Sequence, residues 1–437
     1  MPSNAPAVSN PASAISVKVP DGPKYAIRCT LTRLRNDGPR VDDRRVNAVG
    51  SAVNSSRSRW SVLIAYASVA AASQTLWLTY APVTTVAADH YGVSIGAIGW
   101  LANIEPLLYV LLALPAGLLL DRSFRSSLAA GAILSAIGAI VRLLGDDYSW
   151  ALIGQLIAAV AQPLLLSAIA KVAREYLTEK DRPAGIALGA CSLTAGQLLA
   201  IVLGAALSAP DQIPDLELIG AVFAAVSAIV LVLCLLRPSP YPSGRVAAGL
   251  ESLRVVWSDR AIRIMCGVVF LGFGIYIAET TWLQALLEPA GITASSAGVL
   301  LVIMLVAGTI GAATLPTTIA RRNAQPAMLF ASVIVGIVAA LALAVAPGFG
   351  VGVAVLAVSG FLNVAALPVI LELAERRAGA AGGAVASLVW LAGNAGGLVV
   401  ALSVQALVDT PAAAFTLLAV FGLLAVPLLV ALRKRIA

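Results

Sequence analysis

The chain has few charged residues and little histidine or cysteine, and each shortage excludes a class of protein. Asp, Glu, Lys and Arg make up 12% of the 437 residues, while hydrophobic residues reach 59%. Soluble domains carry about 25% charged residues, so this composition excludes an ordinary soluble enzyme and indicates a protein solvated by lipid. A single histidine argues against a haem-ligating or His-rich metal protein. The cysteines show no CxxC spacing and predict neither a disulfide framework nor a zinc site: Cys29, Cys191, Cys234 and Cys266.

Long apolar stretches follow a polar beginning. Residues 1–58 are rich in Pro, Ser, Asn and Arg, which predicts a disordered tail without a cleavable signal peptide. From Trp60 onward, stretches long enough to cross about 30 Å of hydrocarbon recur between short polar breaks. They predict an all-α membrane protein with twelve transmembrane helices: 60–87, 94–120, 127–145, 149–170, 183–208, 216–236, 263–287, 294–320, 326–346, 348–373, 381–407 and 411–432.

The basic residues test this count, because Lys and Arg gather in the cytoplasmic segments of membrane proteins. If the spans alternate from a cytoplasmic tail, 28 of the 29 Lys and Arg residues fall on the cytoplasmic side. The exception is Arg142, which we expect to pair with Asp146 or Asp147 at the outer surface. His90 is expected to be a solvated residue of an outer loop. Both termini are therefore predicted to be cytoplasmic, in the plasma membrane.

The net charge of +7 is explained by this topology and by anionic lipid. We therefore expect the bilayer, and no nucleic acid, as the large partner, and a monomer as the state of the chain. The longest interior polar segment divides the spans into two groups of six. The predicted parts are a disordered cytoplasmic tail 1–58, an N-terminal half 59–237, a cytoplasmic linker 238–262 and a C-terminal half 263–437.

An internal repeat supports the division into halves. Leu166–Arg174 aligns with Leu367–Glu375 at an offset of 201 residues, and this offset matches Gln162 with Asn363. Two corresponding six-helix halves resemble the major facilitator transporters, in which the substrate binds near the bilayer midplane between the halves.

A second mark of that superfamily lies between the second and third predicted spans. Gly117-Leu-Leu-Leu-Asp121-Arg122, with Arg125 following, resembles its signature at this place. The resemblance implies that Asp121, Arg122 and Arg125 form gating ion pairs. The alternative is that the two arginines only anchor the helix ends at the membrane surface.

Polar side chains deep inside the predicted spans are costly and mark functional sites unless they join helices by hydrogen bonds. Glu105 and Glu279 are expected to bind a cation or the proton that couples transport. Four further residues lie at similar depth and are candidates for substrate binding: Gln162, Tyr276, Asn363 and Asn394.

Several segments of the chain are similar to one particular family of solute carriers. Trp77-Leu-Thr-Tyr80, Tyr91-Gly-Val-Ser94, Leu114-Pro-Ala116, Val160-Ala-Gln-Pro163 and Ala195-Gly-Gln-Leu198 are similar to the feline leukaemia virus subgroup C receptor family of solute carriers. Members of that family carry choline and ethanolamine, and haem export has been attributed to them.

The resemblance also assigns roles to individual residues. It implies that Trp77 and Tyr276 form a cage for a quaternary ammonium group, whose charge is attracted by the ring faces. It implies that Gln162 lines the same cavity and that Asn394 stands where the family has a glutamine. The eukaryotic members do not have acids in place of Glu105 and Glu279, which would suit a smaller, hydrogen-bonding cation or a proton.

The expected function is transport of a small organic cation or amine, similar to choline or ethanolamine, by alternating access and without a cofactor. One alternative is a proton-coupled exporter of drugs or other metabolites that uses Glu105 or Glu279. A second alternative is a membrane sensor that binds its ligand without transport. No nucleophile with a base and no metal cluster reaches one depth in the predicted spans, so an enzyme is not expected.

Overall fold

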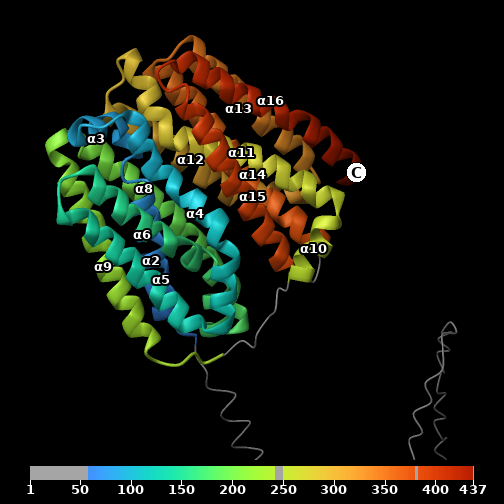
Figure 1. Ribbon diagram of the computed structural model, residues 1–437. Coiled ribbons are helices and arrows are strands. Elements are labelled where there is room, and N and C mark those ends of the chain that lie inside the picture. The colour runs from blue at the N-terminus through green and yellow to red at the C-terminus, as the bar shows by residue number, and fades with distance from the viewer. Residues whose placement is uncertain (1–57, 242–249, 379–381, 437) are drawn as a thin grey trace, which may run out of the picture. The chain divides into compact units, whose positions relative to one another are not determined.

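The computed structural model describes residues 58–241, 250–378 and 382–436, and helices dominate this part of the chain (Figure 1). Twelve helical segments are long and apolar enough to cross a membrane, which confirms the predicted number of spans. The α-helices are α2 (Trp60–Trp77), α3 (Thr84–Tyr91), α4 (Ile95–Arg122), α5 (Phe124–Val141), α6 (Tyr148–Leu166), α7 (Ile169–Tyr176), α8 (Arg182–Ala206), α9 (Ile213–Leu235), α10 (Leu250–Ser258), α11 (Arg260–Leu287), α12 (Ala294–Arg321), α13 (Gln325–Val345), α14 (Phe349–Ala378), α15 (Gly382–Gln405) and α16 (Pro411–Ile436).

The predicted limits of the spans agree closely with these helices, with two exceptions. The first predicted span, 60–87, is interrupted after Trp77, where a turn and a short helix precede α3. The fourth predicted span continues to residue 170, whereas α6 ends at Leu166. Pro163 lies in the last turn of α6, and a turn at Ser167 separates this helix from α7. Pro163 has no N–H to donate to the Ala159 carbonyl oxygen, which weakens α6 near this end. The predicted tail up to residue 57, and residues 242–249 of the predicted linker, lie outside the described residues.

Within each group of six spans, some helices approach so closely that only glycine fits between them. A Cβ atom at Gly196 of α8 would lie 2.0 Å from the Ala71 carbonyl oxygen of α2. A Cβ atom at Gly396 of α15 would lie 1.8 Å from the Phe270 carbonyl oxygen of α11. Small residues at helix contacts are the usual means of packing in membranes, where the hydrophobic effect does not drive helices together. The helices of each half therefore meet backbone against backbone.

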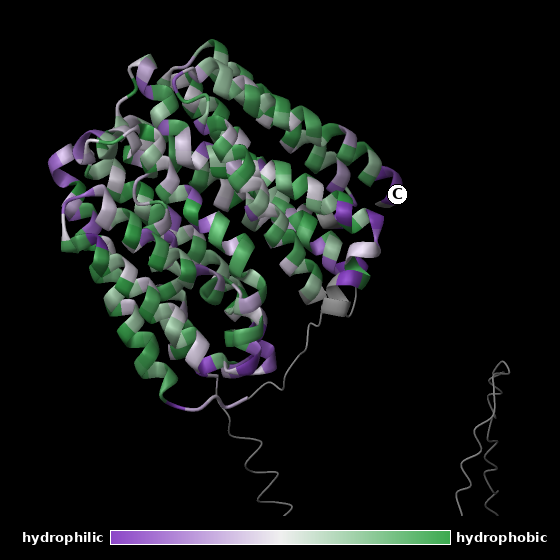
Figure 2. Cartoon of the chain, in the orientation of Figure 1, coloured by the Kyte–Doolittle hydropathy of each residue, from purple (hydrophilic) through white to green (hydrophobic). Residues whose placement is uncertain are grey.

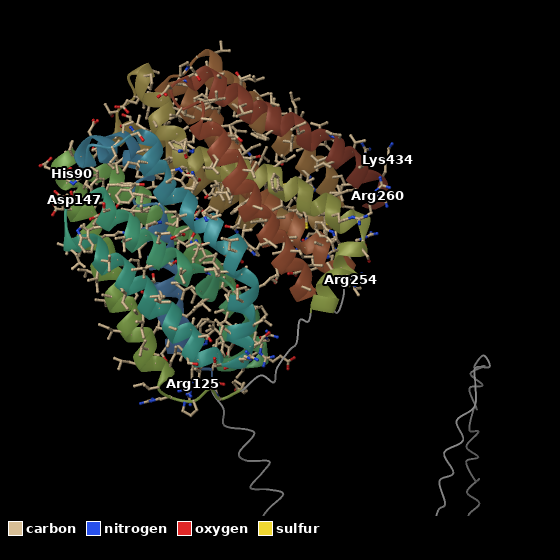
Figure 3. The ribbon with its side chains drawn as sticks, viewed as in Figure 1. His90, Arg125, Asp147, Arg254, Arg260 and Lys434 are labelled. Carbon is tan, nitrogen blue, oxygen red and sulfur yellow. The ribbon has the colours of Figure 1, made fainter. Side chains whose placement is uncertain are left out.

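Hydrophilic residues gather at the ends of the helical bundle, while apolar residues cover the length of the spans (Figure 2). We call one end the acidic end and define it by Asp89, Asp146, Asp211, Glu288 and Asp409, which lie in or beside connections there. The opposite, basic end is defined by Arg122, Arg125, Arg376, Arg377 and Lys434. In the first half, Figure 3 shows His90 and Asp147 at one end of the helices and Arg125 at the other end. In the second half, it shows Arg260 and Lys434 at the same end of the helices.

The two halves meet near the acidic end. Asn103 of α4 donates a hydrogen bond to Gln405 of α15 at 3.3 Å, and Gln405 Nε2 donates to the Gly96 carbonyl oxygen at 3.2 Å. Close by, Gln284 of α11 accepts from the Thr85 backbone N–H at 3.0 Å and donates to the Thr85 hydroxyl at 2.8 Å. We call this set of contacts the acidic-end closure.

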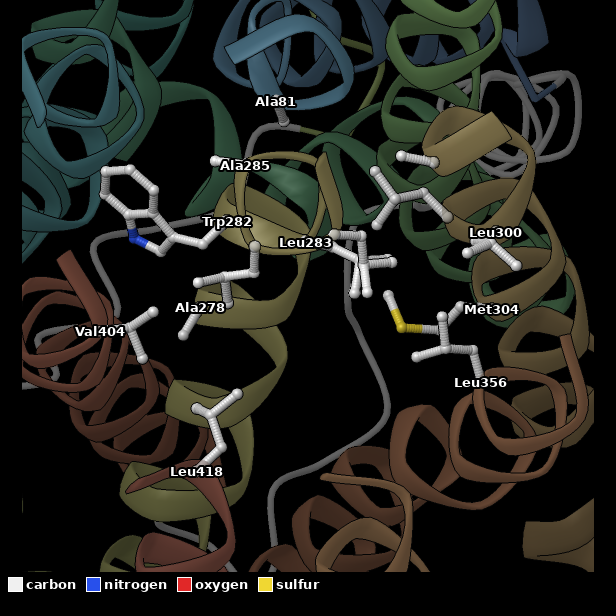
Figure 4. Close-up of a cluster of buried hydrophobic side chains, with 14 of the residues drawn as sticks. Ala81, Ala278, Trp282, Leu283, Ala285, Leu300, Met304, Leu356, Val404 and Leu418 are labelled. Carbon is white, nitrogen blue, oxygen red and sulfur yellow. The ribbon is translucent and has the colours of Figure 1, made fainter. Parts of the chain in front are cut away.

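An apolar cluster shared by both halves supports the acidic-end closure. Trp77, Ala81 and Ile201 of the first half pack in one buried cluster with Trp282, Met304 and many other residues of the second. Figure 4 shows Ala81 near Ala285, with Trp282 and Val404 in the same cluster. The Trp282 indole N–H donates to the Ala401 carbonyl oxygen at 3.1 Å, which fixes the ring against α15. Apolar packing and buried amide bonds therefore hold the halves together at this end.

Candidate functional site

A cavity of about 510 Å³ lies between the two halves, within the range of about 300–1,000 Å³ that is usual for small-molecule sites. It contacts α2, α4, α6 and α8 of the first half and α11 to α16 of the second. The five residues predicted to bind substrate all line it: Trp77, Gln162, Tyr276, Asn363 and Asn394. Gln162 and Asn363, which the internal repeat aligns, therefore face the same space from opposite halves.

The second half supplies a wall of aromatic rings to the cavity. Phe273 stacks on Tyr276 with a centroid distance of 5.7 Å, and it meets Trp390 edge to face at 5.8 Å. The sequence analysis did not single out Phe273 or Trp390. Helical spacing could have found them, because Phe273 precedes Tyr276 by one turn on α11 and Trp390 precedes Asn394 by one turn on α15.

A chain of amides connects this wall to the first half. The Tyr276 hydroxyl donates to Gln197 Oε1 at 2.8 Å, and Gln197 Nε2 donates to Gln74 Oε1 at 2.8 Å. Both glutamines line the cavity, and Gln74 Nε2 is buried without a hydrogen-bond partner in the described part. The sequence analysis assigned no role to either glutamine, although Gln197 lies in the segment Ala195–Leu198. An unpaired buried donor is costly, so Gln74 is suited to meet a polar atom of a bound molecule.

The two predicted acids lie behind the cavity wall rather than in it. Gln162, which lines the cavity, donates to Glu105 Oε2 at 2.5 Å, and Pro106 beside Glu105 is also a lining residue. Glu279 is 6% exposed and follows Tyr276 by one turn of α11 toward the acidic end. None of the lining residues in the described part is charged. The cavity therefore combines aromatic faces and neutral amides with two carboxyl groups close behind them.

Comparison with known families identifies the architecture. The family model described as Major Facilitator Superfamily matches residues 62–401, which is more than half of the chain. The chain belongs to the major facilitator superfamily. It is therefore a membrane transporter with two six-helix halves rather than an enzyme.

Curated relatives of this major facilitator include solute carriers. Solute carrier family 49 member A3 from Danio rerio is 28% identical over 273 residues, covering 59% of this chain and 58% of the relative. The choline/ethanolamine transporter FLVCR2 from Homo sapiens is 29% identical over 172 residues, covering 38% of this chain and 32% of the relative. These matches confirm the predicted resemblance. The chain spans little more than half of the first relative and about a third of the second.

Solved structures show the same fold at low identity. A POT family transporter in complex with 5-aminolevulinic acid has a TM-score of 0.68 at 11% identity, covering 86% of this chain and 96% of that one. A bacterial homologue of the human lysosomal transporter Spinster, in an inward-facing and occupied conformation, has a TM-score of 0.66 at 14% identity, covering 85% and 96%.

Two of the three predicted gating side chains of this major facilitator form contacts inside the first half. Asp121 accepts an ion pair from Lys171 of α7 at 2.9 Å, and Arg125 Nε donates to the Leu235 carbonyl oxygen at 2.9 Å. Arg122 is exposed. In the described residues, no hydrogen bond or ion pair joins these three side chains to the second half. Their gating role stays a prediction. It applies to a conformation in which the two halves meet at the basic end.

The expectation for Arg142 was wrong. Its side chain turns into the first half, where it is 1% exposed, instead of pairing with Asp146 or Asp147. The guanidinium donates to the Leu76 carbonyl oxygen at 3.3 Å and lies 5.8 Å from the centre of the Tyr80 ring. Two buried acids of the first half attract it, Glu105 and Glu217. Opposite charges attract more strongly in a poorly solvated interior than at a surface in water.

His90 also differs from its prediction, because it forms a contact instead of being freely solvated. His90 Nε2 lies 2.7 Å from Asp146 Oδ1, and the imidazole packs edge to face on Tyr91. The Asp146 carboxylate expected to bind Arg142 therefore binds His90.

Proposed function

We propose that the chain transports a small organic cation or amine, similar to choline or ethanolamine, by alternating access between its halves. The observation that carries the proposal is the presence of Trp77 and Tyr276 in one cavity, contributed by opposite halves. Ring faces attract a quaternary ammonium group that cannot donate hydrogen bonds. The name of the relative FLVCR2, a choline/ethanolamine transporter, supports the same substrate class.

The charges around the cavity support a cationic substrate. No lysine or arginine is among the described lining residues, so no basic side chain there opposes a cation. Glu279 lies one turn beyond Tyr276 and attracts positive charge from behind the aromatic wall. The amides of Gln74, Gln162 and Asn394 can accept or donate hydrogen bonds to the hydroxyl or amino group of an alkanolamine.

The position of the cavity supports alternating access. The halves are joined at the acidic-end closure, and the lining of the cavity continues toward the basic end as far as Ala187, Leu329 and Leu371. We assign the basic end to the cytoplasm, because basic residues concentrate there. In that orientation the structure is the inward-open state. Asp121, Arg122 and Arg125 would then act when the basic ends close.

Direct binding tests the substrate class. Choline and ethanolamine should raise the melting temperature of the purified protein, because a ligand that binds only the folded state stabilises it. Cys191 is exposed and lines the cavity, so both ligands should also slow its reaction with a thiol reagent. The assay uses a variant in which Cys29 is replaced by serine, and the buried Cys266 is the internal control. Absence of both effects at millimolar ligand would refute this substrate class.

Labelling from each side of the membrane tests the orientation. An impermeant thiol reagent should modify a cysteine placed at Asp89 or Asp409 in intact cells. A cysteine placed at Arg376 should react only after the membrane is permeabilised. The expectation follows from the separation of acidic and basic ends. Labelling of the Arg376 position in intact cells would reverse the assignment of the two sides.

A proton-coupled exporter is the second candidate, and the burial of both predicted acids favours it. Glu105 is 1% exposed and Glu279 is 6% exposed, and an isolated carboxylate at such depth is strongly disfavoured. A lipophilic substrate would then replace the alkanolamine and exchange with a proton. Thermal shifts produced by lipophilic cations, but not by choline or ethanolamine, would select this candidate.

A further inference from the structure

A line of polar side chains crosses the interior of the first half, separate from the cavity between the halves. It starts at Tyr91 near the acidic end and finishes at Glu105 and Gln162 beside the cavity. The side chains come from α3, α9, α4 and α6, from the turn that follows α2 and from the short helix η2 (Arg142–Leu144). The superfamily fold does not require such a line, and substrate binding in the cavity does not use its outer part.

The outer part of the line is a cluster around Glu217. Glu217 Oε1 accepts hydrogen bonds from the hydroxyl groups of Tyr80 and Tyr91, the latter at 2.7 Å. Tyr91 is partly exposed, whereas Glu217 is 6% exposed and Tyr80 is 4% exposed. Tyr91 also packs against His90, which contacts Asp146. A buried carboxyl group is thus joined to the acidic-end surface through a phenol.

The inner part of the line contains four buried side chains with unused hydrogen-bonding atoms. In the described part, partners are missing at Glu105 Oε1, Gln162 Oε1, Arg142 Nε and Nη1, and both side-chain polar atoms of Gln155. Gln155 lies two turns before Gln162 on α6, next to Gly154, whose surface packs on the Arg142 side chain. Buried groups that lack protein partners are usually satisfied by internal water. The unpaired atoms include both donors, on Arg142 and Gln155, and acceptors, on Glu105, Gln155 and Gln162, so internal water could bind to either kind.

Arg142 links the two parts. Its charge acts on both Glu105 and Glu217, and its ring contact is with Tyr80. The other charged group that acts on Glu217 is Asp146. An arginine keeps its proton, so it cannot relay one, but it stabilises whichever carboxyl group is ionised and orders nearby water.

α4 packs against α2, α3, α5, α6, α11 and α15. The described residues of α15 include no ionisable side chain, and α6 contributes the Gln162 amide, which donates to Glu105, with Gln155 two turns away. The remaining first-half helices contribute these ionisable groups: Tyr66 from α2, Asp89, His90 and Tyr91 from α3 at the acidic end, and Arg125 from α5 at the basic end. The second half presents Glu279 from α11. Arg142 is the oppositely charged group whose effect on Glu105 the structure shows.

We propose that this line is a proton path through the first half, which delivers a proton from the acidic end to Glu105 independently of the substrate route. The proton is taken from hydronium at Tyr91, which leaves water, and passes through Glu217 and internal water between Arg142 and Gln155. It converts the Glu105 carboxylate to the carboxylic acid. Release into water of the cavity restores the carboxylate, so each cycle carries one proton. The inference rests on the proposed transport of a cation, whose movement this proton would drive.

Proteoliposomes containing the full chain test the path through pH-driven choline flux. Glu105→Gln should remove the response of flux to a pH gradient imposed from the acidic end. Glu217→Gln should slow this response by at least about tenfold relative to exchange at equal pH in the same vesicles. Glutamine can still accept the bonds from Tyr80, Tyr91 and Gln162, so both variants should fold. Asp215→Asn, on an exposed position of the same helix as Glu217, should respond like the wild type.

An infrared titration without substrate provides the second measurement. The band of protonated carboxyl groups should change with pH in the wild type and lose a component in Glu105→Gln. A wild-type pH response in either glutamine variant overturns the proton path, as does a wild-type flux indifferent to the gradient. If the wild type exchanges no choline or ethanolamine, the proposed substrate fails. The infrared titration still tests the path in that case. If the band of protonated carboxyl groups is the same in Glu105→Gln as in the wild type, the path is overturned as well.

Discussion

Replacement of Gly99 by alanine should prevent the acidic-end closure and stop transport. A Cβ atom at this position would lie 1.9 Å from Cη2 of the Trp282 ring in the opposite half. Trp282 cannot move aside easily, because its side chain is completely buried and its indole N–H binds the Ala401 carbonyl oxygen. The halves must therefore separate at the acidic end, which favours a state that is open at that end. Uptake of labelled choline and the reaction of Cys191 with a thiol reagent from the basic end should both fall strongly.

Gly350→Ala is the matched control, because Gly350 also lies in a helix, α14, and a Cβ atom there would contact nothing within 4 Å. This variant should transport like the wild type. A reduced amount of Gly99→Ala in the membrane would indicate a folding defect, so both variants are compared at equal surface density. Normal labelling of Cys191 in Gly99→Ala would show that the closure tolerates the added carbon.

Loss of either cavity ring should weaken the binding of a cationic substrate. Trp77→Ala and Tyr276→Ala should each cost about 0.5–2 kcal/mol of binding free energy, which is roughly a two- to thirtyfold loss of affinity for choline. Trp77→Phe should have a smaller effect, because a ring face remains. Tyr276→Phe keeps the ring and removes the bond to Gln197, so it separates ring attraction from hydrogen bonding. Affinity is measured by titration of the purified protein.

A buried aromatic residue outside the cavity provides the control. Phe415 is 1% exposed in the cluster shared by the halves and is not among the lining residues. Phe415→Leu should lower thermal stability without changing affinity for choline. Unchanged affinity in both alanine variants, at normal membrane levels, would show that the aromatic cage does not exist in this chain.

The fold was predictable from sequence because lipid imposes a simple rule on it. Every span needs about 20 apolar residues, and the basic residues between spans report which connections share a side. The break between the ninth and tenth spans, predicted at Pro347 and Gly348, lies in the structure between Val345 and Phe349. The turn after Leu166 was missed because the apolar pattern continues across it.

The cavity was predictable where polar residues stand alone among apolar ones, as Gln162 and Asn363 do. Gln74 and Gln197 were missed because nothing in the sequence shows that they are bonded to each other across two helices. Arg142 and Glu217 were missed for a different reason. Both stand near predicted helix ends, where a charged side chain normally reaches water, and only tertiary packing shows that they turn inward.

The backbone-to-backbone packing at Gly196 and Gly396 makes each half stiff, whereas amide bonds and side-chain contacts, such as Trp282 on Gly99 and Ala205 on Gly298, join one half to the other. The interface between the two halves is therefore the part of the molecule that deforms most easily. A compound that binds in this interface beside Trp282 would stop the whole transport cycle without resembling the substrate. A compound bound to the lipid-facing surface of either half would meet a rigid body and leave the cycle unchanged.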